Sequence, residues 1–329
     1  MPELRQNLAT KEWVVIATER SLRPEQLRPG RPAGAKPPEK DPQCPFCPGN
    51  EGASETLYAH GEPRWRVRVV KNKFPALVPG AGSLEPKGNL YRRLPGEGTH
   101  EVIVESPSHN SPLALLPHEQ VRDVLAVLQE RFRINQENPK VNMVMLFKNH
   151  GAGAGTSLEH PHSQIVGSSV VPAHIRHRMD EAEKYFAQNA ECVFCRMNEE
   201  EKAQGERLLA ETPYFLAYVL FAALSPFHIW VVPRRHTAGF AEITSAEADD
   251  LARVLQGILK KLHQGLANPD YNFVVQSIPQ DRGQVEPFHW YLSLVVRAGS
   301  AAGFELGSGM YINQVLPEES ARFLNSVKG

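Results

Sequence analysis

Apolar and polar residues alternate along this chain in two kinds of pattern, one typical of strands and the other of helices. The strand-like runs cover residues 13–17, 65–70, 100–105, 141–147, 215–220, 229–232 and 272–276. Helical spacing of apolar residues covers 118–135 and 245–266, and a more polar helix is expected at about 174–189. This mixture of short strands and amphipathic helices predicts an α+β fold.

The pattern occurs twice along the chain. The segment PSHNSPLALLPHEQVRDVLAVLQ from residue 107 aligns with RRHTAGFAEITSAEADDLARVLQ at an offset of 127, which places His109 on His236. Further on, an offset of 129 places His160 on His289. We therefore expect a duplicated strand, helix and strand module, with one repeat over residues 1–172 and the other over residues 173–329.

Composition narrows the classes of function. A length of 329 residues allows roughly two domains at about 150 residues each. The 36 Lys and Arg residues nearly balance the 37 Asp and Glu residues, so no long-range positive field favours nucleic acid or an anionic membrane as a partner. The longest apolar stretch has ten residues, too short to span a bilayer, and we see no secretion signal. We expect a globular, cytoplasmic protein.

The four cysteines form two CxxC pairs, one in each repeat. A single pair is also compatible with two buried small side chains or a redox pair. Each repeat adds two histidines, however, and two cysteines with two histidines form a closed tetrahedral zinc site of the structural type. The expected ligands are Cys44, Cys47, His109 and His160 at site one, and Cys192, Cys195, His236 and His289 at site two. His228 competes for one position at site two, although a core role explains it better.

The segment FKNHGAGAGTSLEHPHSQIVG, residues 147–167, contains the most informative motif. Its glycines, Gly151, Gly153 and Gly155, allow backbone N–H groups to approach an anion such as phosphate. A flexible turn is the alternative interpretation. The segment lacks the GK[ST] of a P-loop, and Pro161 excludes the helix that a dinucleotide-binding fingerprint requires.

His160 and His162 face the same side of an extended segment, so one histidine can bind a metal while the other meets a substrate. A neutral imidazole at His162 is a competent nucleophile towards phosphorus and gives a phosphoramidate. That both histidines bind metal is less favoured, because site one already has four ligands and Tyr291 replaces His162 in the second repeat. Ser157 and Gln164 can donate hydrogen bonds to phosphoryl oxygens.

Five segments together resemble the galactose-1-phosphate uridylyltransferase family, a branch of the histidine-triad superfamily in which glutamine replaces the third histidine. They are HPHSQ at 160–164, CPFCPGN at 44–50, WVVIATERSLRP at 13–24, VVKNKFPAL at 69–77 and FKNHGAGAGTS at 147–157. The resemblance covers nearly the whole chain. It implies a duplicated histidine-triad-like fold with an antiparallel half-barrel sheet and flanking helices, and usually a homodimer.

The resemblance also implies a reaction and a set of site residues. His162 is similar to the nucleophile that attacks the α-phosphorus of a nucleoside diphosphate sugar in a ping-pong transfer, with a hexose 1-phosphate as leaving group. Gln164 and Ser157 resemble the residues that hold the transferred phosphate, and the four ligands of site one match the family's zinc site. The residues expected to line the nucleotide and phosphate pocket are Arg20, Arg23, Asn72, Phe74 and Asn149. Phe304 and Glu305 match a sugar-contacting segment that the partner subunit provides.

Some features resemble a different branch of the family. Pro287 stands where some uridylyltransferases have one of two paired histidines, so the second metal site of those enzymes is not expected here. The CxxC at 192 and the FHWYLS and GFELGSGMYIN segments are similar to the ADP-glucose phosphorylase branch, which also has a second zinc. Asn313 lies about where galactose enzymes often have glutamine.

The leading interpretation is therefore transfer of UMP between UDP-glucose and galactose 1-phosphate, in galactose metabolism. The first alternative is transfer of AMP from ADP-glucose to phosphate through the same intermediate. A hydrolase of dinucleoside polyphosphates and a zinc-stabilised nucleotide-binding protein without turnover are lower-ranked alternatives.

Overall fold

The computed structural model describes residues 1–18, 37–84, 90–280, 285–299 and 301–328. Its helices are α1 His118–Gln136, α2 Ala173–Asn189, α3 Val193–Gln204, α4 Ser245–Gly265, α5 Gly303–Ser308 and α6 Pro317–Ser326. The strands up to residue 168 are β1 Glu3–Gln6, β2 Trp13–Ile16, β3 Thr56–His60, β4 Val67–Lys71, β5 Gly98–Val104, β6 Met143–His150 and β7 His162–Ser168. The later strands are β8 Leu208–Glu211, β9 Phe215–Val219, β10 His228–Pro233, β11 Tyr271–Gln276, β12 Tyr291–Val296 and β13 Tyr311–Asn313. None of the helices in these ranges has the length and apolar character needed to cross a bilayer.

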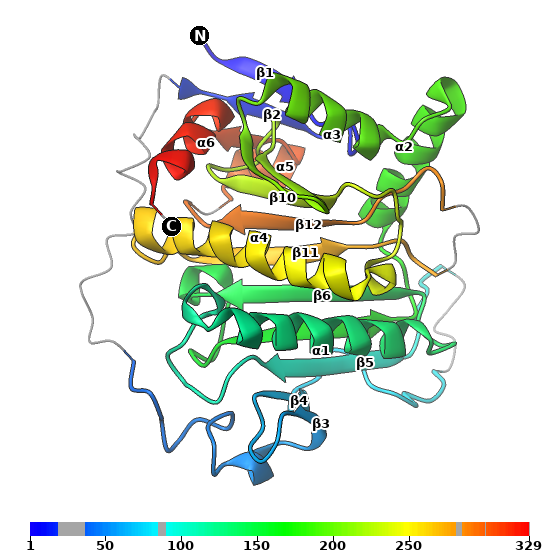
Figure 1. Ribbon diagram of the computed structural model, residues 1–329. Coiled ribbons are helices and arrows are strands. Elements are labelled where there is room, and N and C mark those ends of the chain that lie inside the picture. The colour runs from blue at the N-terminus through cyan, green and yellow to red at the C-terminus, as the bar shows by residue number, and fades with distance from the viewer. Residues whose placement is uncertain (19–36, 85–89, 281–284, 300, 329) are drawn as a thin grey trace.

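Among the described residues, ten strands form one antiparallel sheet in the order β3-β4-β5-β7-β6-β11-β12-β10-β9-β8. The order is symmetric about its centre. Counted inwards from the two edges, β3, β4, β5, β7 and β6 correspond to β8, β9, β10, β12 and β11. The two halves meet where β6 pairs with β11, in the middle of the sheet (Figure 1). The expected duplicated α+β fold with an antiparallel sheet is therefore confirmed.

Helices α1 and α4 lie side by side on one face of this sheet (Figure 1). Matching glutamines connect the two repeats across this layer. Gln129 in α1 donates to the carbonyl oxygens of Ala241 and Ile243 before α4, and Gln256 in α4 donates to that of Leu116 before α1. Each repeat thus donates hydrogen bonds to backbone carbonyl oxygens of the other. The two glutamines, which are 127 residues apart in the sequence, therefore occupy equivalent positions in the structure.

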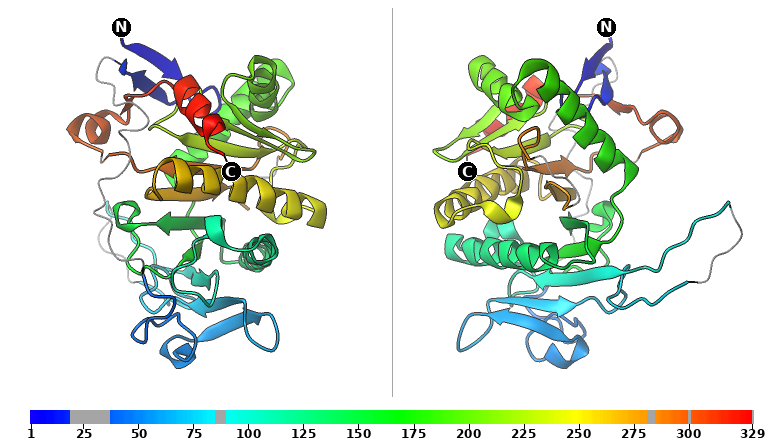
Figure 2. Two further views of the ribbon diagram at one scale, coloured as in Figure 1. Left: turned by 60° about the vertical axis from the view of Figure 1, so that its left-hand side comes forward. Right: turned by 90° about the vertical axis from the view of Figure 1, so that its right-hand side faces the viewer.

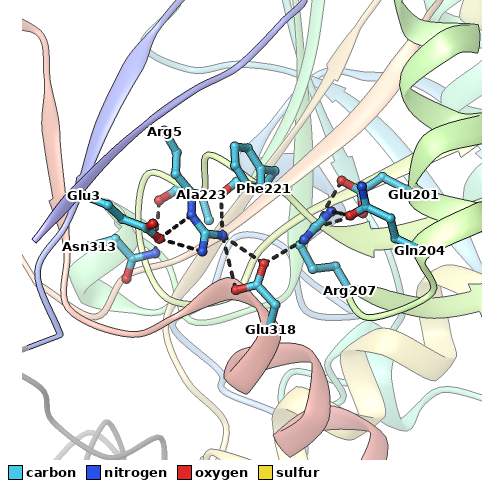
Figure 3. Close-up of polar contacts among 9 residues, drawn as sticks. All are labelled: Glu3, Arg5, Glu201, Gln204, Arg207, Phe221, Ala223, Asn313 and Glu318. Carbon is cyan, nitrogen blue, oxygen red and sulfur yellow. Dashed lines mark hydrogen bonds and ion pairs between the residues drawn. The ribbon is translucent and has the colours of Figure 1, made fainter. Parts of the chain in front are cut away.

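The small sheet β1-β2-β13 lies at the opposite end of the molecule from β3 and β4 (Figures 1 and 2). Ion pairs connect this end to the second repeat (Figure 3). Glu318 at the start of α6 accepts from Arg5 at 2.8 Å and from Arg207 at 2.7 Å, and Arg207 also pairs with Glu201. Both guanidinium groups lie over the ring of Phe221, at 4.4 and 5.2 Å from its centroid. The N-terminal strand, α3 and the C-terminal helix are thereby joined through one carboxylate.

The sequence pattern predicted only part of these elements. It did not predict the edge strands β3 and β8, the inner strand β12, the small-sheet strands β1 and β13, or the helices α3, α5 and α6. At β4 it predicted alternation, whereas Val67, Val69 and Val70 are all buried. The reason is that β4 is covered on both faces, since Val67 and Val69 pack in the main core and Val70 packs against the first CxxC loop.

Candidate active site and metal centres

Four side chains from distant parts of the chain meet at one end of β5 and β7. The Cys47 sulfur lies 3.5 Å from His109 Nδ1 and 3.6 Å from His160 Nδ1, and the Cys44 sulfur lies 3.7 Å from His160 Nδ1. In a tetrahedral zinc site with bonds of about 2.3 Å to sulfur and about 2.0 Å to nitrogen, neighbouring ligand atoms are about 3.5 Å apart. All four side chains are buried, and they form a group that can hold a metal ion.

Hydrogen bonds around this group select the ligand atoms. His160 Nε2 lies 2.8 Å from the carbonyl oxygen of Ser106, so Nε2 carries the hydrogen and Nδ1 is free to bind a metal. The backbone N–H groups of Asp41 and Phe46 each donate to a cysteine sulfur at 3.4 Å. Burial lowers the pKa of His160 to about 4, so the ring is neutral, as a ligand must be.

The second repeat brings three of its four expected ligands together. Cys192, Cys195 and His236 form a group that can hold a metal ion, with 3.3 Å between the Cys195 sulfur and His236 Nδ1. The His289 ring lies 5.4 Å from that of His236 and perpendicular to it, much as His160 lies relative to His109. The His289 Nδ1 instead contacts the carbonyl oxygen of Trp290 at 2.8 Å. His228 does not join the group.

His162 opens β7, and only 7% of its surface is exposed. Its Nδ1 lies 2.8 Å from the carbonyl oxygen of His160, so Nδ1 carries the hydrogen and Nε2 keeps its lone pair. Burial lowers the pKa of His162, which favours the neutral ring that a nucleophile requires. The Phe46 ring packs against the imidazole with a centroid distance of 5.4 Å. His162 is thus oriented by backbone and packing with one nitrogen available.

Two cavities meet at His162. One has a volume of about 360 Å³, and we call it the glycine-loop cavity; its lining includes Asn149, Gly151, Ser157, His160 and His162. The other has a volume of about 450 Å³, and we call it the β4 cavity; its lining includes Asn72, Phe74, Ser157, His162 and Gln164. A ligand with two parts, one in each cavity, would therefore have its junction at the imidazole.

A buried ion pair supports the strand that carries His162. Lys148 Nζ lies 2.8 Å from both carboxylate oxygens of Glu105, and both side chains are almost fully buried. Lys148 also donates to the carbonyl oxygen of His162 at 3.1 Å, and Ser163 donates to Glu105 at 2.6 Å. A buried pair of this kind is costly to desolvate, and here its spare hydrogen bonds fix the backbone and side chain directly at the imidazole.

The glycine loop follows β6 and is shaped partly by a carboxylate. Gly151 and Gly155 have φ values of +84° and +87°, in the region that favours glycine. A Cβ at Gly151 would overlap the Asp270 carboxylate. The N–H of Gly153 donates to Asp270 at 2.6 Å. One of the N–H groups that the sequence analysis assigned to a ligand anion is therefore bound by a carboxylate of the protein itself.

Comparisons with known proteins show which family the chain belongs to. The family model described as galactose-1-phosphate uridyl transferase, N-terminal domain, matches residues 1–172, and the model of its C-terminal domain matches residues 178–291. The chain belongs to this family. The resemblance noted from its motifs is confirmed.

Relatives with two different names are similar to this chain. An ADP-glucose phosphorylase from Arabidopsis thaliana is 32% identical over 99% of this chain and 93% of its own length. A galactose-1-phosphate uridylyltransferase from Thermotoga maritima is 27% identical over 100% of this chain and 99% of its own length. A solved structure of the Arabidopsis ADP-glucose phosphorylase with bound ADP-glucose has a TM-score of 0.84 at 30% identity, covering 100% of this chain and 99% of that chain. A uridylyltransferase structure has a TM-score of 0.76 at 28% identity, covering 99% and 98%.

The remaining residues that the family resemblance pointed to fall in different places. Asn149 lines the glycine-loop cavity, where Asn272 donates to its side-chain oxygen at 2.8 Å. Phe304 and Glu305 lie in α5, and Glu305 lines a separate cavity. Arg20 and Arg23 lie outside the described residues. Asn313 is fully buried and donates to the carbonyl oxygen of Ala223, as Figure 3 shows.

Lys148 and Glu105 did not emerge from the sequence analysis as site residues, although a signal existed. Each is a charged residue that directly follows an apolar run, Met143–Phe147 before Lys148 and Val102–Val104 before Glu105. Charged residues at such positions are buried only when they are paired. A search for charged residues beside apolar strand runs would have marked Lys148 and Glu105 as candidates, although only the arrangement of the strands shows that they are paired.

Proposed function

We propose that this protein is a nucleotidyltransferase that exchanges hexose 1-phosphates on a nucleoside diphosphate sugar through a covalent intermediate on His162. The observation that carries the proposal is the position of His162, which has a fixed tautomer and lies where the two cavities meet. Family membership supports the reaction class. UDP-glucose and galactose 1-phosphate are the first substrate pair, in line with the uridylyltransferase relatives.

In the first half-reaction His162 Nε2 attacks the α-phosphorus of the sugar nucleotide. A nitrogen–phosphorus bond forms, the anhydride bond to the β-phosphate breaks, and hexose 1-phosphate leaves with the bonding electrons. In the second half-reaction a phosphate oxygen of the incoming hexose 1-phosphate attacks the same phosphorus, and the imidazole leaves. His160 holds the Nδ1 hydrogen through its carbonyl oxygen in both steps. Gln164 and Ser157 are proposed to donate to the non-bridging oxygens.

Zinc is the proposed metal at site one, because two thiolates and two imidazoles in tetrahedral arrangement are the donors it prefers. With all four positions taken, the ion would have a structural role and would hold His160, and therefore His162, in place. We propose a second zinc on Cys192, Cys195 and His236, completed by His289 after rotation of its ring. We also propose a cytoplasmic homodimer in which the partner supplies Phe304 and Glu305.

ADP-glucose phosphorylase is the second candidate, and two observations favour it. The Arabidopsis enzyme of that name is more similar to this chain than the uridylyltransferases compared above. In addition, Asn313 Nδ2 donates to the carbonyl oxygen of Ala223, and Asn313 Oδ1 accepts from the N–H of Val315. The Asn313 side chain is therefore not available to a sugar hydroxyl. In this candidate AMP passes to inorganic phosphate through the same His162 intermediate.

Intact mass of the protein after mixing with UDP-glucose, or separately with ADP-glucose, tests both candidates. A gain of UMP mass that galactose 1-phosphate discharges supports the uridylyltransferase. A gain of AMP mass that phosphate discharges supports the phosphorylase. His162→Asn is the control, because it should abolish the adduct while the melting temperature and metal content stay unchanged. If wild-type protein with its metal bound gives no adduct from either compound, the covalent mechanism is wrong.

A further inference from the structure

His100 lies in β5 on the same face of the sheet as Gln164 in β7. In the register of the two strands His100 pairs with Val166 and Val102 pairs with Gln164, so the two side chains are diagonal neighbours. His100 Nε2 lies 2.8 Å from Gln164 Oε1. Gln164 lines the β4 cavity together with His162, whereas His100 stands behind it.

The backbone fixes the tautomer of His100. The N–H of Ala76 points at His100 Nδ1 from 3.1 Å, and a backbone N–H can only donate. Nδ1 is therefore an acceptor, and the ring hydrogen is on Nε2. Asn72 Nδ2 also lies 3.0 Å from His100 Nε2, but the Asn72 oxygen is bound to the N–H of Phe74, and an amide nitrogen cannot accept. Gln164 Oε1 is therefore the acceptor for the His100 hydrogen.

This contact decides which end of the Gln164 amide remains free. Its oxygen is bound to His100, so its nitrogen, with two hydrogens, is the end that can serve a ligand. A reversed amide would offer an oxygen to the phosphoryl group and would repel it. We propose that His100 is a positioning residue, which holds Gln164 with its amide nitrogen free to donate to a phosphoryl oxygen at His162. The inference rests on the proposed function.

The second repeat contains the same contact at the equivalent positions. His228 pairs with Val295 in β10 and β12, as His100 pairs with Val166, and its Nδ1 accepts from the N–H of Leu224 at 3.3 Å. Its Nε2 lies 2.9 Å from Ser293 Oγ, and Ser293 is the counterpart of Gln164. Because Tyr291 replaces the nucleophile there, this repeat supplies a matched control with the same imidazole contact and no reaction.

Two substitutions separate positioning from a purely structural role. In His100→Asn the new carboxamide oxygen can keep the bond to the Ala76 N–H, but the donor to Gln164 is lost. In His100→Gln the amide nitrogen reaches further and can still donate to Gln164. We expect His100→Asn to slow adduct formation at saturating sugar nucleotide by about 10- to 100-fold, with substrate affinity nearly unchanged. His100→Gln should stay within about threefold of wild type.

The measurement is the single-turnover rate of the mass gain on His162, with UDP-glucose and ADP-glucose in separate reactions. Adding His100→Asn to Gln164→Ala should cause no further loss, because His100 acts through Gln164. His228→Asn should keep the wild-type rate. Three results would each overturn the inference. They are an equal loss of rate in both His100 variants, a further loss of rate in the double variant, and a loss of rate in His228→Asn equal to that in His100→Asn. No adduct in wild type would instead refute the proposed function.

Discussion

His162 Nδ1 lies 2.8 Å from the carbonyl oxygen of His160, so the proposed nucleophile is oriented by the backbone of a metal-ligand residue. Pro161 separates the two residues and restricts the backbone of His160 to extended conformations. A change at the metal site therefore reaches the imidazole through one peptide unit. We expect metal binding at this site to be coupled to nucleotidyl transfer, although four protein ligands would leave the metal no open position for substrate.

Loss of one sulfur ligand at site one tests this coupling. We expect Cys44→Ser to lose one equivalent of bound metal, to lower the melting temperature, and to slow adduct formation on His162, because His160 loses its anchor. Metal content by mass spectrometry, thermal melting and the intact-mass assay measure the three effects. Full zinc content with an unchanged melting temperature would show that Cys44 is not a ligand.

The buried pair of Lys148 and Glu105 gives a second prediction. Lys148→Met leaves a carboxylate buried without its cation, and we expect a loss of about 3–5 kcal/mol in the free energy of unfolding. The double variant Lys148→Met, Glu105→Leu removes both charges and should recover most of that loss. Adduct formation on His162 should be slower in both variants, because each loses the hydrogen bond from Lys148 to the His162 carbonyl oxygen. Chemical denaturation checks the stability, and equal destabilisation of the two variants would contradict this account.

The glycine loop gives a third prediction with a control next to it. Gly151→Ala places a methyl group against the Asp270 carboxylate, in a backbone conformation that alanine rarely adopts. We expect a cost of about 2–4 kcal/mol and a clear loss of adduct formation. Gly155→Ala has a similar φ but open space around it, so its cost should be about 1–2 kcal/mol. If the two variants behave alike in melting and in the adduct assay, contact with Asp270 is not what shapes the loop.

The sequence predicted the parts of the site that depend on residue type and spacing. Cys44, Cys47, His109 and His160 could be grouped because the duplication gave two copies of one ligand pattern. The sequence could not predict that His289 turns its Nδ1 towards a carbonyl oxygen, because the orientation of the ring depends on packing around Trp290.

Contacts between strands were also beyond the sequence. The pairing of Lys148 with Glu105, and of His100 with Gln164, depends on the order β5-β7-β6 and on its register. The palindromic sheet and its central β6–β11 pair follow from how the two repeats join, which spacing along the chain does not encode. The edge strands β3 and β8 are short, and β3 is mostly exposed, so neither has a strong apolar pattern.

The last prediction concerns Glu318, which binds Arg5 and Arg207 together (Figure 3). Burial acts to raise the pKa of Glu318, but hydrogen bonds from the two arginines offset it, and the net effect is a lowered pKa. A carboxyl group with a lowered folded-state pKa stabilises the fold above its unfolded-state pKa, and this contribution is lost as the pH falls through the folded-state value. Glu318→Gln should therefore cost about 1–3 kcal/mol at pH 7 and progressively less below about pH 4.

Glu119→Gln is the matched control, because Glu119 also pairs with an arginine, Arg66, but on the surface. Its cost should be much smaller than that of Glu318→Gln, because solvent screens an exposed ion pair. Thermal melting of wild type and both variants from pH 7 down to about pH 2.5 measures the differences, because the Glu318 contribution should be lost below about pH 4. A Glu318→Gln deficit that stays constant over this range would mean that the carboxylate charge contributes nothing, and that the join between the N-terminal strand and α6 depends on packing around Phe221 instead.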